Sequence, residues 1–208
     1  MLYYSAIDAA TLELLIKIQK LPLFKNLCLA GGTSLALQIG HRKSIDLDFF
    51  GKLKSDEIEI NKQLKQLGSI QLIHKTENIF IYLINNIKID IVNYHYEWLE
   101  KPILTEGIKL AGKKDIAAMK LSAITGRGTK KDFFDLYFLL QKYSMTEMFN
   151  FYKQKYDDGS EFLVIKSLSY FDDAEKQMDP EMLKKINWQK VKNNIKKEVE
   201  KYIKEKNS

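Results

Sequence analysis

Two carboxylates, Asp46 and Asp48, stand two residues apart within the mostly apolar residues 45–50. Residues i and i+2 of a β-strand project from the same face, so a strand would hold both carboxylates side by side and turn Leu47 into the core. Two such charges repel each other unless a cation or a proton lies between them. Mg²⁺ or Mn²⁺ accepts carboxylate and phosphate oxygens as ligands and assists in-line displacement at phosphorus. Two aspartates at this spacing more often mark an exposed strand face than a metal site. A second feature is therefore needed before the pair indicates a functional site.

That second feature is a pair of glycines about a helix length upstream. Gly31 and Gly32 can adopt positive φ and allow a ligand to approach the backbone closely. We expect Thr33 or Ser34 to cap a helix through residues 35–39, whose free N–H groups would form an anion site. A glycine pair before a helix is by itself only a turn and a cap. Together with the downstream carboxylates, it predicts a nucleotide site.

A third carboxylate, Asp90, lies in a predicted strand at residues 87–92. Alternation places three isoleucines on one face of this strand and Lys88, Asp90 and Val92 on the other. An ionisable residue in an apolar strand is unusual, but on a half-exposed sheet it would mean little. The spacing alone favours a surface position for Asp90 over a functional role.

A second group of charged residues follows in a helical region. Lys120 lies on the same face of the predicted helix 115–125 as two isoleucines. Its side chain therefore either extends to solvent or pairs with a buried anion. Asp132 and Asp135 are three residues apart on one helical face, which is also typical of a solvated helix start. The loop between the two helices lacks the order of a Walker A sequence. It is predicted to be a helix break that presents Arg127 and Lys130.

A sheet must position the carboxylates, and the apolar patterns predict one. Strands are expected at residues 46–50, 69–75, 79–84, 87–92 and 103–110, with Asn85 and Asn86 as a tight turn. Helices are expected at residues 11–19, from an N-cap at Ser55 to Gly68, and at 115–125, 130–140 and 188–206. We therefore predict two lobes: residues 1–111 with the sheet and the metal site, and residues 112–208, which are helical and complete the active site.

Composition limits the class of protein. The chain has 208 residues, 45% hydrophobic and 29% charged, which is enough for one domain or two small lobes. Its single cysteine, Cys28, excludes an internal disulfide and fits a reducing compartment. No run is long enough for a membrane span, and no signal peptide is recognisable, so we expect a cytoplasmic protein without membrane contact. The net charge of +6 favours an anionic partner such as RNA.

The motifs resemble those of a known family. Residues 29–37, then Arg42, Ser44 and residues 46–50, resemble the signature of the AbiEii/AbiGii nucleotidyltransferase toxins. These belong to the DNA polymerase β-like nucleotidyltransferase superfamily and include the mycobacterial MenT toxins. Residues 119–121, Arg127 and residues 131–137 resemble the downstream motifs in the expected order, and residues 167–175 resemble a C-terminal helix.

The resemblance implies an α+β fold, in which a polymerase β-like nucleotidyltransferase lobe with a mixed or antiparallel sheet precedes a helical C-terminal lobe. It implies a Mg²⁺-dependent enzyme that transfers NMP from an NTP to an acceptor hydroxyl, as the toxin of a bacterial toxin–antitoxin or abortive-infection system. Family members suggest the 3′ end of tRNA as the acceptor, and a cognate antitoxin that need not touch the toxin.

The resemblance also implies roles for particular residues. The expected catalytic residues are Asp46, Asp48, Asp90, Lys120 and Asp132. The expected metal ligands are Asp46, Asp48 and Asp90. The expected nucleotide-binding residues are Gly31, Gly32, Thr33, Ser34, Arg42, Ser44 and Lys120. Either Asp90 or Asp132 would position or deprotonate the acceptor hydroxyl, and Asp135 would orient Lys120, Arg127 or the local backbone.

Three alternatives remain open at the level of the sequence. A protein-nucleotidylating enzyme would use the same pocket with a different acceptor. A non-catalytic nucleic-acid-binding or partner-binding domain could retain the fold, although a degenerate site would be expected to lose at least one of its three carboxylates. A metal-dependent nuclease could use the carboxylates too, but the glycine turn favours a triphosphate substrate.

Overall fold

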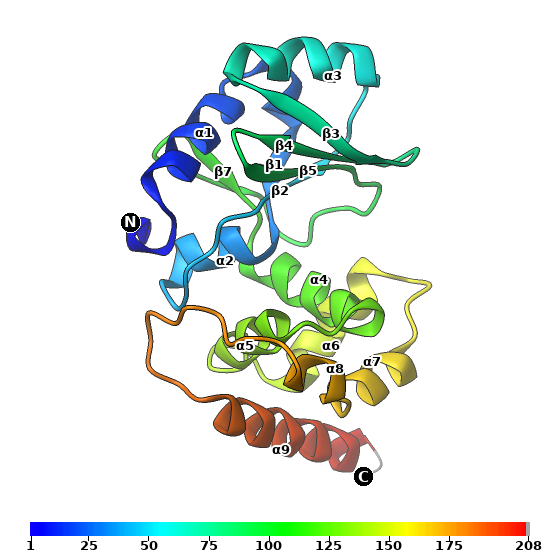
Figure 1. Ribbon diagram of the computed structural model, residues 1–208. Helices are drawn as coiled ribbons and strands as arrows, with labels where there is room; N and C mark the ends of the chain where they lie inside the picture. Colours follow the sequence, from blue (N-terminus) through cyan, green and yellow to red (C-terminus); the bar gives the residue numbers. More distant parts are fainter. Residues whose placement is uncertain (207–208) are drawn as a thin grey trace. The chain divides into compact units, whose positions relative to one another are not determined.

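The computed structural model describes residues 1–206 (Figure 1). The chain divides into two compact units. The sheet unit contains Met1–Tyr96 and Lys101–Gly112, and the helical unit contains Glu97–Glu100 and the chain from Lys113 onward. Residues 207–208, the end of the predicted helical lobe, lie outside the described residues.

The sheet unit is built on a mixed sheet of seven strands. These are β1 (Leu27–Leu29), β2 (Leu47–Gly51), β3 (Ile70–Lys75), β4 (Ile79–Ile84), β5 (Ile87–Asn93), β6 (Ile103–Thr105) and β7 (Ile108–Leu110), in the order β3-β4-β5-β2-β1-β7-β6. The β2–β5 and β1–β7 pairs are parallel and the other neighbours are antiparallel. With the helical C-terminal region, this confirms the predicted α+β fold class.

One face of the sheet is covered by α1 (Ala9–Gln19) and α3 (Glu57–Leu64), while α2 (Gly31–Ile39) joins β1 to the segment before β2 (Figure 1). The core side chains come from alternate strand positions, as the pleat requires. In β2, Leu47 and Phe49 are fully buried in this core, and Asp48 and Phe50 lie on the other face. The same alternation in β5 buries Ile89 and Ile91. The polar positions of β2 and β5 therefore share the face opposite α1 and α3.

Local sequence patterns predicted one turn of the sheet unit correctly, but they missed a second turn and misplaced a helix cap. Asn85 and Asn86 both adopt positive φ, 49° and 66°, as a two-residue hairpin turn requires, which confirms that prediction. The single strand predicted at residues 103–110 is wrong, because positive φ at Glu106 and Gly107, 53° and 77°, folds it into the β6–β7 hairpin. The N-cap of α3 is Asp56, whose side chain accepts from the N–H of Glu59, rather than the predicted Ser55.

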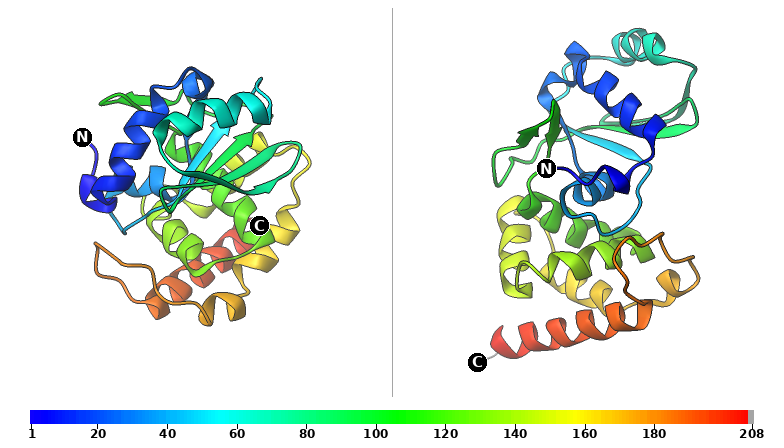
Figure 2. Two further views of the ribbon diagram at one scale, coloured as in Figure 1. Left: turned by 45° about the horizontal axis from the view of Figure 1, so that its top comes forward. Right: turned by 90° about the vertical axis from the view of Figure 1, so that its left-hand side faces the viewer.

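The helical unit contains α4 (Lys113–Gly126), α5 (Lys130–Leu139), α6 (Met145–Lys155), α7 (Glu161–Leu168), α8 (Asp172–Glu175) and α9 (Trp188–Lys206). The longest, α9, packs along α5, α6 and α7 and is coloured orange to red in Figure 2. Its Trp188 stacks on Phe134 at 5.8 Å between ring centroids. Residues 167–175 do not form the one helix that the family resemblance implied, because they span the end of α7, a bend and α8. Among residues 1–206, none of the helices is both long and apolar enough to cross a membrane.

A fully buried ion pair explains why Glu97–Glu100 belong to the helical unit. The Asp115 carboxylate accepts from the N–H groups of Leu99 at 2.9 Å and Glu100 at 3.2 Å. Lys155 Nζ lies 2.7 Å from the same carboxylate and donates to the Glu97 carbonyl at 2.9 Å. A buried charge needs such partners because it has lost its contact with water. These contacts join residues distant in sequence, and none was predicted.

Candidate active site

The start of α2 differs from the sequence-based expectation both in its cap and in its position, because the helix begins before Thr33 and Ser34. The helix begins at Gly31, and its N-cap is Ala30, which makes no side-chain capping hydrogen bond. Thr33 and Ser34 therefore lie inside the first turn, so the predicted cap is wrong. The Thr33 hydroxyl instead donates to the main-chain carbonyl of Asp46 and lies 2.8 Å from the Ser44 hydroxyl oxygen. Thr33 thus joins the beginning of the helix to the segment that precedes β2.

The closest link between the glycine turn and the carboxylates is the contact of Gly31 with Asp48. Gly31 has a φ of +63°, and a Cβ on it would lie 2.3 Å from Asp48 Oδ2. The N–H of Ala30 donates to the main-chain carbonyl of Asp48 at 2.8 Å. Only glycine fits here, since both the positive φ and the carboxylate exclude a side chain. The Asp48 carboxylate consequently lies against the first turn of α2, where free N–H groups form an anion site.

The register of the sheet brings a second carboxylate to Asp48. Asp48 and Asp90 are direct partners in the parallel β2–β5 pair and lie on the same face, opposite the core. Asp46 is half-buried and lies immediately before β2 rather than within it. The structure thus brings Asp48 and Asp90 side by side, with Asp46 two residues upstream.

The charge of Asp90 is already balanced within this site. Lys88 Nζ lies 2.5 and 2.6 Å from its two carboxylate oxygens. Within residues 1–206, groups of three or more histidine, cysteine or acidic side chains arranged to hold a metal ion are absent. Two neighbouring carboxylates on one face nevertheless have the donor chemistry that a hard divalent cation requires. Lys88 shows that Asp90 accepts a cation from this side, so the residues fit a metal that would replace the ammonium.

The other predicted nucleotide-binding residues of the sheet unit are mostly enclosed. Arg42 is 3% exposed, and its Nη1 donates to the carbonyl of Lys43 at 2.9 Å. Ser34 is buried and accepts from Gln38 Nε2 at 3.2 Å. Gly32 is also buried within the helix. These residues support the shape of the turn, and their contacts with a nucleotide stay predictions.

In the helical unit, the Lys120 ammonium forms ion pairs with buried carboxylates and does not extend to solvent. It is 5% exposed, and its Nζ lies 2.7 Å from Asp132 Oδ1 and 2.6 Å from Asp135 Oδ2. Both aspartates are fully buried, which rules out the solvated helix start considered from the sequence. Burial by itself raises the pKa of Asp132, but the charges of Lys120 and Arg127 outweigh it and hold that pKa below its ordinary value. Asp132 is therefore ionised at neutral pH.

The loop before α5 presents only one of the two cations expected there. The Arg127 side chain is 63% exposed, and its Nε lies 3.4 Å from Asp132 Oδ2. Lys130 is buried instead, which makes that part of the prediction wrong. Its Nζ lies 3.0 Å from Asp179 Oδ1 and 5.3 Å from the centre of the Trp188 ring. The partners of Lys130, Asp179 and Trp188, are about 50 residues or more away in the sequence, so the local pattern could not predict that this side chain is buried.

Comparisons with known proteins show the family of this chain. The family described as nucleotidyl transferase AbiEii toxin of type IV toxin–antitoxin systems matches residues 13–205. The chain belongs to the AbiEii nucleotidyltransferase toxin family. This confirms the family and the enzyme class that the motifs indicated. Membership of a type IV toxin–antitoxin family implies an NTP substrate and a cognate antitoxin.

Individual relatives extend over nearly the whole AbiEii chain. An uncharacterized protein of Aquifex aeolicus is 36% identical over 197 residues, which cover 92% of this chain and 95% of the relative. A crystal structure from Helicobacter pylori, described as that of a nucleotidyltransferase, has a TM-score of 0.58 at 17% identity and covers 92% of this chain and 90% of its own. MenT4, a nucleotidyltransferase toxin of Mycobacterium tuberculosis, has a TM-score of 0.56 at 14% identity, covering 92% and 84%. These solved structures share the fold.

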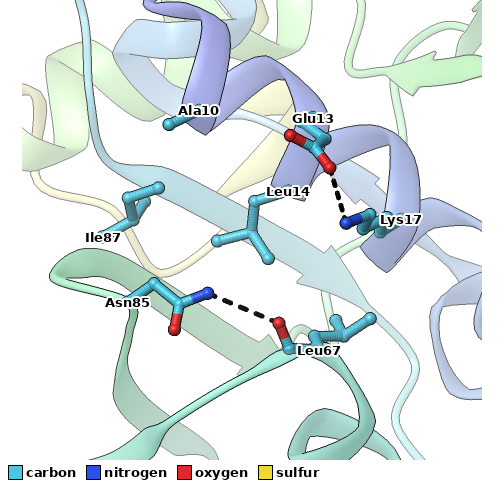
Figure 3. Close-up of a pocket in the computed structure, with 7 residues that line it drawn as sticks. All are labelled: Ala10, Glu13, Leu14, Lys17, Leu67, Asn85 and Ile87. Carbon is cyan, nitrogen blue, oxygen red and sulfur yellow. Dashed lines mark hydrogen bonds and ion pairs between the residues drawn. The ribbon is translucent and has the colours of Figure 1, made fainter.

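A cavity elsewhere in the sheet unit of this AbiEii protein takes no part in the site. It has a volume of about 170 Å³ and lies between α1 and the β4–β5 turn (Figure 3). Glu13 pairs with Lys17 at 2.6 Å, and Asn85 Nδ2 donates to the Leu67 carbonyl at 3.4 Å. These polar groups satisfy one another, and the predicted site residues are not among the cavity's lining.

Sequence reasoning missed one residue of the candidate site, Lys88, and gave another, Thr33, a different contact. Lys88 neutralises Asp90, and its position two residues away on the same strand face was a usable signal. Thr33 was assigned to a cap, whereas it holds the carbonyl of Asp46. No local pattern distinguishes these two uses of a threonine after a glycine pair.

Proposed function

We propose that this AbiEii-family protein transfers a nucleoside monophosphate from an NTP to an acceptor hydroxyl at the 3′ end of a tRNA, with release of pyrophosphate. The observation that carries the chemistry is the packing of the Asp48 carboxylate against Gly31, with Asp90 as its cross-strand partner. This places a helix start suited to phosphate beside two oxygen ligands suited to a divalent cation. A nucleotide with bound Mg²⁺ or Mn²⁺ requires both.

The proposed roles follow the chemistry of each group. The first N–H groups of α2, those of Gly31, Gly32 and Thr33, bind phosphate oxygens, assisted by Ser34, Arg42, Ser44 and Lys120. The N–H of Ser34 itself already donates to the Ala30 carbonyl at 3.3 Å. Asp46, Asp48 and Asp90 hold the divalent cation, which when bound neutralises charge on the reacting phosphate. For this Asp90 must exchange Lys88 for the cation. Such a site works mainly by positioning and by electrostatic stabilisation.

The acceptor hydroxyl must lose its proton during the transfer. Either Asp90 or Asp132 is the proposed carboxylate for this step, because a carboxylate can accept the proton of a hydroxyl group. The low pKa of Asp132 keeps it in the ionised form that can accept a hydrogen bond from a hydroxyl. Asp135 positions Lys120 through the 2.6 Å contact between Oδ2 and Nζ.

An RNA acceptor is supported by charge and by the family resemblance. The chain carries a net charge of +6, and most lysines of α9 lie on its exposed side. Polyanions such as tRNA bind surfaces of this kind through their phosphates. We place this activity in the cytoplasm, where NTPs and tRNA are present, with a cognate antitoxin that relieves the toxicity without a required direct contact.

The test is transfer of label from each α-labelled NTP to total tRNA in the presence of Mg²⁺, with γ-labelled NTP as a parallel. The proposal predicts that only α label reaches RNA and that Asp48→Asn abolishes the transfer. Asp158→Asn, an exposed substitution of the same kind, serves as a control that retains activity. Label on protein would show that the acceptor is a protein and not an RNA. RNA shortening would indicate a nuclease, and no transfer with any NTP would refute the activity.

A further inference from the structure

A second cavity, in the helical unit, has the lining of a small polar binding site. Its volume is about 200 Å³, and it lies where the end of α4 and the loop before α5 meet the segment between α7 and α8. Side chains of opposite charge, Arg127 and Asp173, line it together with Thr125, Ser167 and the aromatic Tyr170. The proposed transfer mechanism uses none of these five side chains directly.

Arg127 can donate hydrogen bonds into this cavity. Its Nε lies 3.4 Å from Asp132 Oδ2, and the side chain is 63% exposed. The guanidinium is a rigid planar group, and an ion pair at Nε leaves its outer edge, made of one N–H from each terminal amino group, available to a ligand. The exposed end therefore offers parallel donors to a ligand with hydrogen-bond acceptors.

Tyr170 and Asp173 supply the other two kinds of contact. Tyr170 is 52% exposed, which leaves its ring available for stacking. Asp173 lines the same cavity as Tyr170, and its charge raises the pKa of the Tyr170 phenol. Asp173 is itself exposed and ionised carboxylates only accept hydrogen bonds. A ligand in the cavity thus meets an aromatic face, a pair of donors and an acceptor.

The volume of the cavity and the kinds of contact that its lining offers indicate the class of ligand. Sites for drug-sized molecules usually measure roughly 300–1,000 Å³, so this cavity fits one planar ring system and not a whole nucleotide. Unpaired bases stack on exposed aromatic rings, and their edges carry both donors and acceptors. Cytosine, adenine and guanine each present an exocyclic amino group that can donate to Asp173, and ring or carbonyl acceptors for Arg127, whereas uracil has no exocyclic amino group.

Neighbouring cations favour a base that belongs to a polynucleotide. Lys166 is exposed in the last turn of α7, one residue before Ser167. The exposed Lys196 of α9 lies with its Nζ 5.5 Å from the centre of the Phe171 ring, the residue after Tyr170. Lysines at such positions suit the phosphates that flank a bound base in a single strand.

We propose that this cavity binds one unpaired base of the acceptor RNA, stacked on Tyr170, and through Arg127 and Asp173 prefers a base with an exocyclic amino group over uracil. The inference rests on the proposed function for the identity of the RNA as acceptor. Arg127 also contacts Asp132, so a base held here lies next to a proposed catalytic group. The cavity would therefore contribute to the choice of RNA rather than to the binding of the triphosphate.

The test is equilibrium binding of short fluorescent single-stranded RNAs that differ only in their 3′-terminal base, without NTP, measured by anisotropy. Tyr170→Ala is expected to weaken binding of the cytosine-ended RNA by about tenfold, whereas Tyr170→Phe, which keeps the ring, stays within about twofold of wild type. Asp173→Asn is expected to shift the preference toward uracil, because its amide can donate to the O4 carbonyl and accept from N3–H. Both positions are exposed, so near-UV circular dichroism should report intact folding in all three variants.

The outcomes separate this proposal from the one it rests on. Unchanged RNA affinity in Tyr170→Ala, an equal loss in Tyr170→Phe, or no change of base preference in Asp173→Asn would overturn it. A raised KM for NTP with unchanged RNA binding in Tyr170→Ala would assign the cavity to the incoming nucleotide and also overturn it. If the expected binding pattern appears while no label transfer occurs with any NTP, the transfer activity fails and the base site stands.

Discussion

Replacing Gly31 with alanine tests the contact on which the candidate site depends. A residue other than glycine at a φ of +63° costs about 1–2 kcal/mol in conformational free energy. The new Cβ would lie 2.3 Å from Asp48 Oδ2, while ordinary contacts begin at 3.4 Å. The carboxylate must therefore move by about 1 Å, a displacement that commonly lowers catalytic rates by about a hundredfold. Gly31→Ala should thus lose much more activity than stability.

Gly107 provides the matched control for this substitution. It also has a positive φ, +77°, but a Cβ there would meet nothing within 4 Å. Gly107→Ala should therefore lower the free energy of unfolding by about 1 kcal/mol, as backbone strain predicts, and leave label transfer to RNA unchanged. The free energy of unfolding is measured by urea denaturation and the rate by transfer from α-labelled NTP. Equal rates in Gly31→Ala and Gly107→Ala would refute the proposed role of the Gly31–Asp48 contact.

Two further substitutions test the helical unit. Lys120→Met leaves the buried carboxylates of Asp132 and Asp135 without their cation and should lower the free energy of unfolding by about 3–5 kcal/mol, measured in urea; a loss below about 1 kcal/mol would contradict the ion pairing. Burial alone raises the pKa of Glu161, but hydrogen bonds, first that of Lys153, lower it from 4.5 to about 2. A lowered folded-state pKa stabilises the protein above pH 4.5, and this stability is lost as the pH falls toward 2. Glu161→Gln should therefore have a lower Tm than wild type at pH 6, with a gap that closes toward pH 2, whereas a constant gap would contradict the assignment.

The parts of the fold that could be predicted are those determined by short-range periodicity. Alternation in residues 87–92 correctly separated the core isoleucines from Lys88 and Asp90, because a pleated strand has only two faces. The Asn85–Asn86 turn was recognisable because asparagine tolerates positive φ. The hairpin at residues 103–110 was missed because Glu106–Gly107 is a weaker turn signal than asparagine or aspartate before glycine.

The parts that could not be predicted are contacts between distant segments. Lys120 on an apolar stripe had two outcomes, and the choice depended on Asp132 and Asp135, which a neighbouring helix supplies. The register that pairs Asp48 with Asp90 likewise depends on which strands become neighbours. Local sequence determines which side of a strand a carboxylate occupies, but the sheet order determines what lies beside it.

The central claim is that Asp48 and Asp90 jointly hold the divalent cation, and Mn²⁺ binding measured by electron paramagnetic resonance tests it most directly. We predict that Asp48→Asn and Asp90→Asn each weaken Mn²⁺ binding by at least about tenfold, while Asp158→Asn has no effect. Lys88→Met should strengthen binding, because it removes the ammonium that now occupies Asp90. Equal Mn²⁺ affinity in wild type, Asp48→Asn and Asp90→Asn would contradict the account.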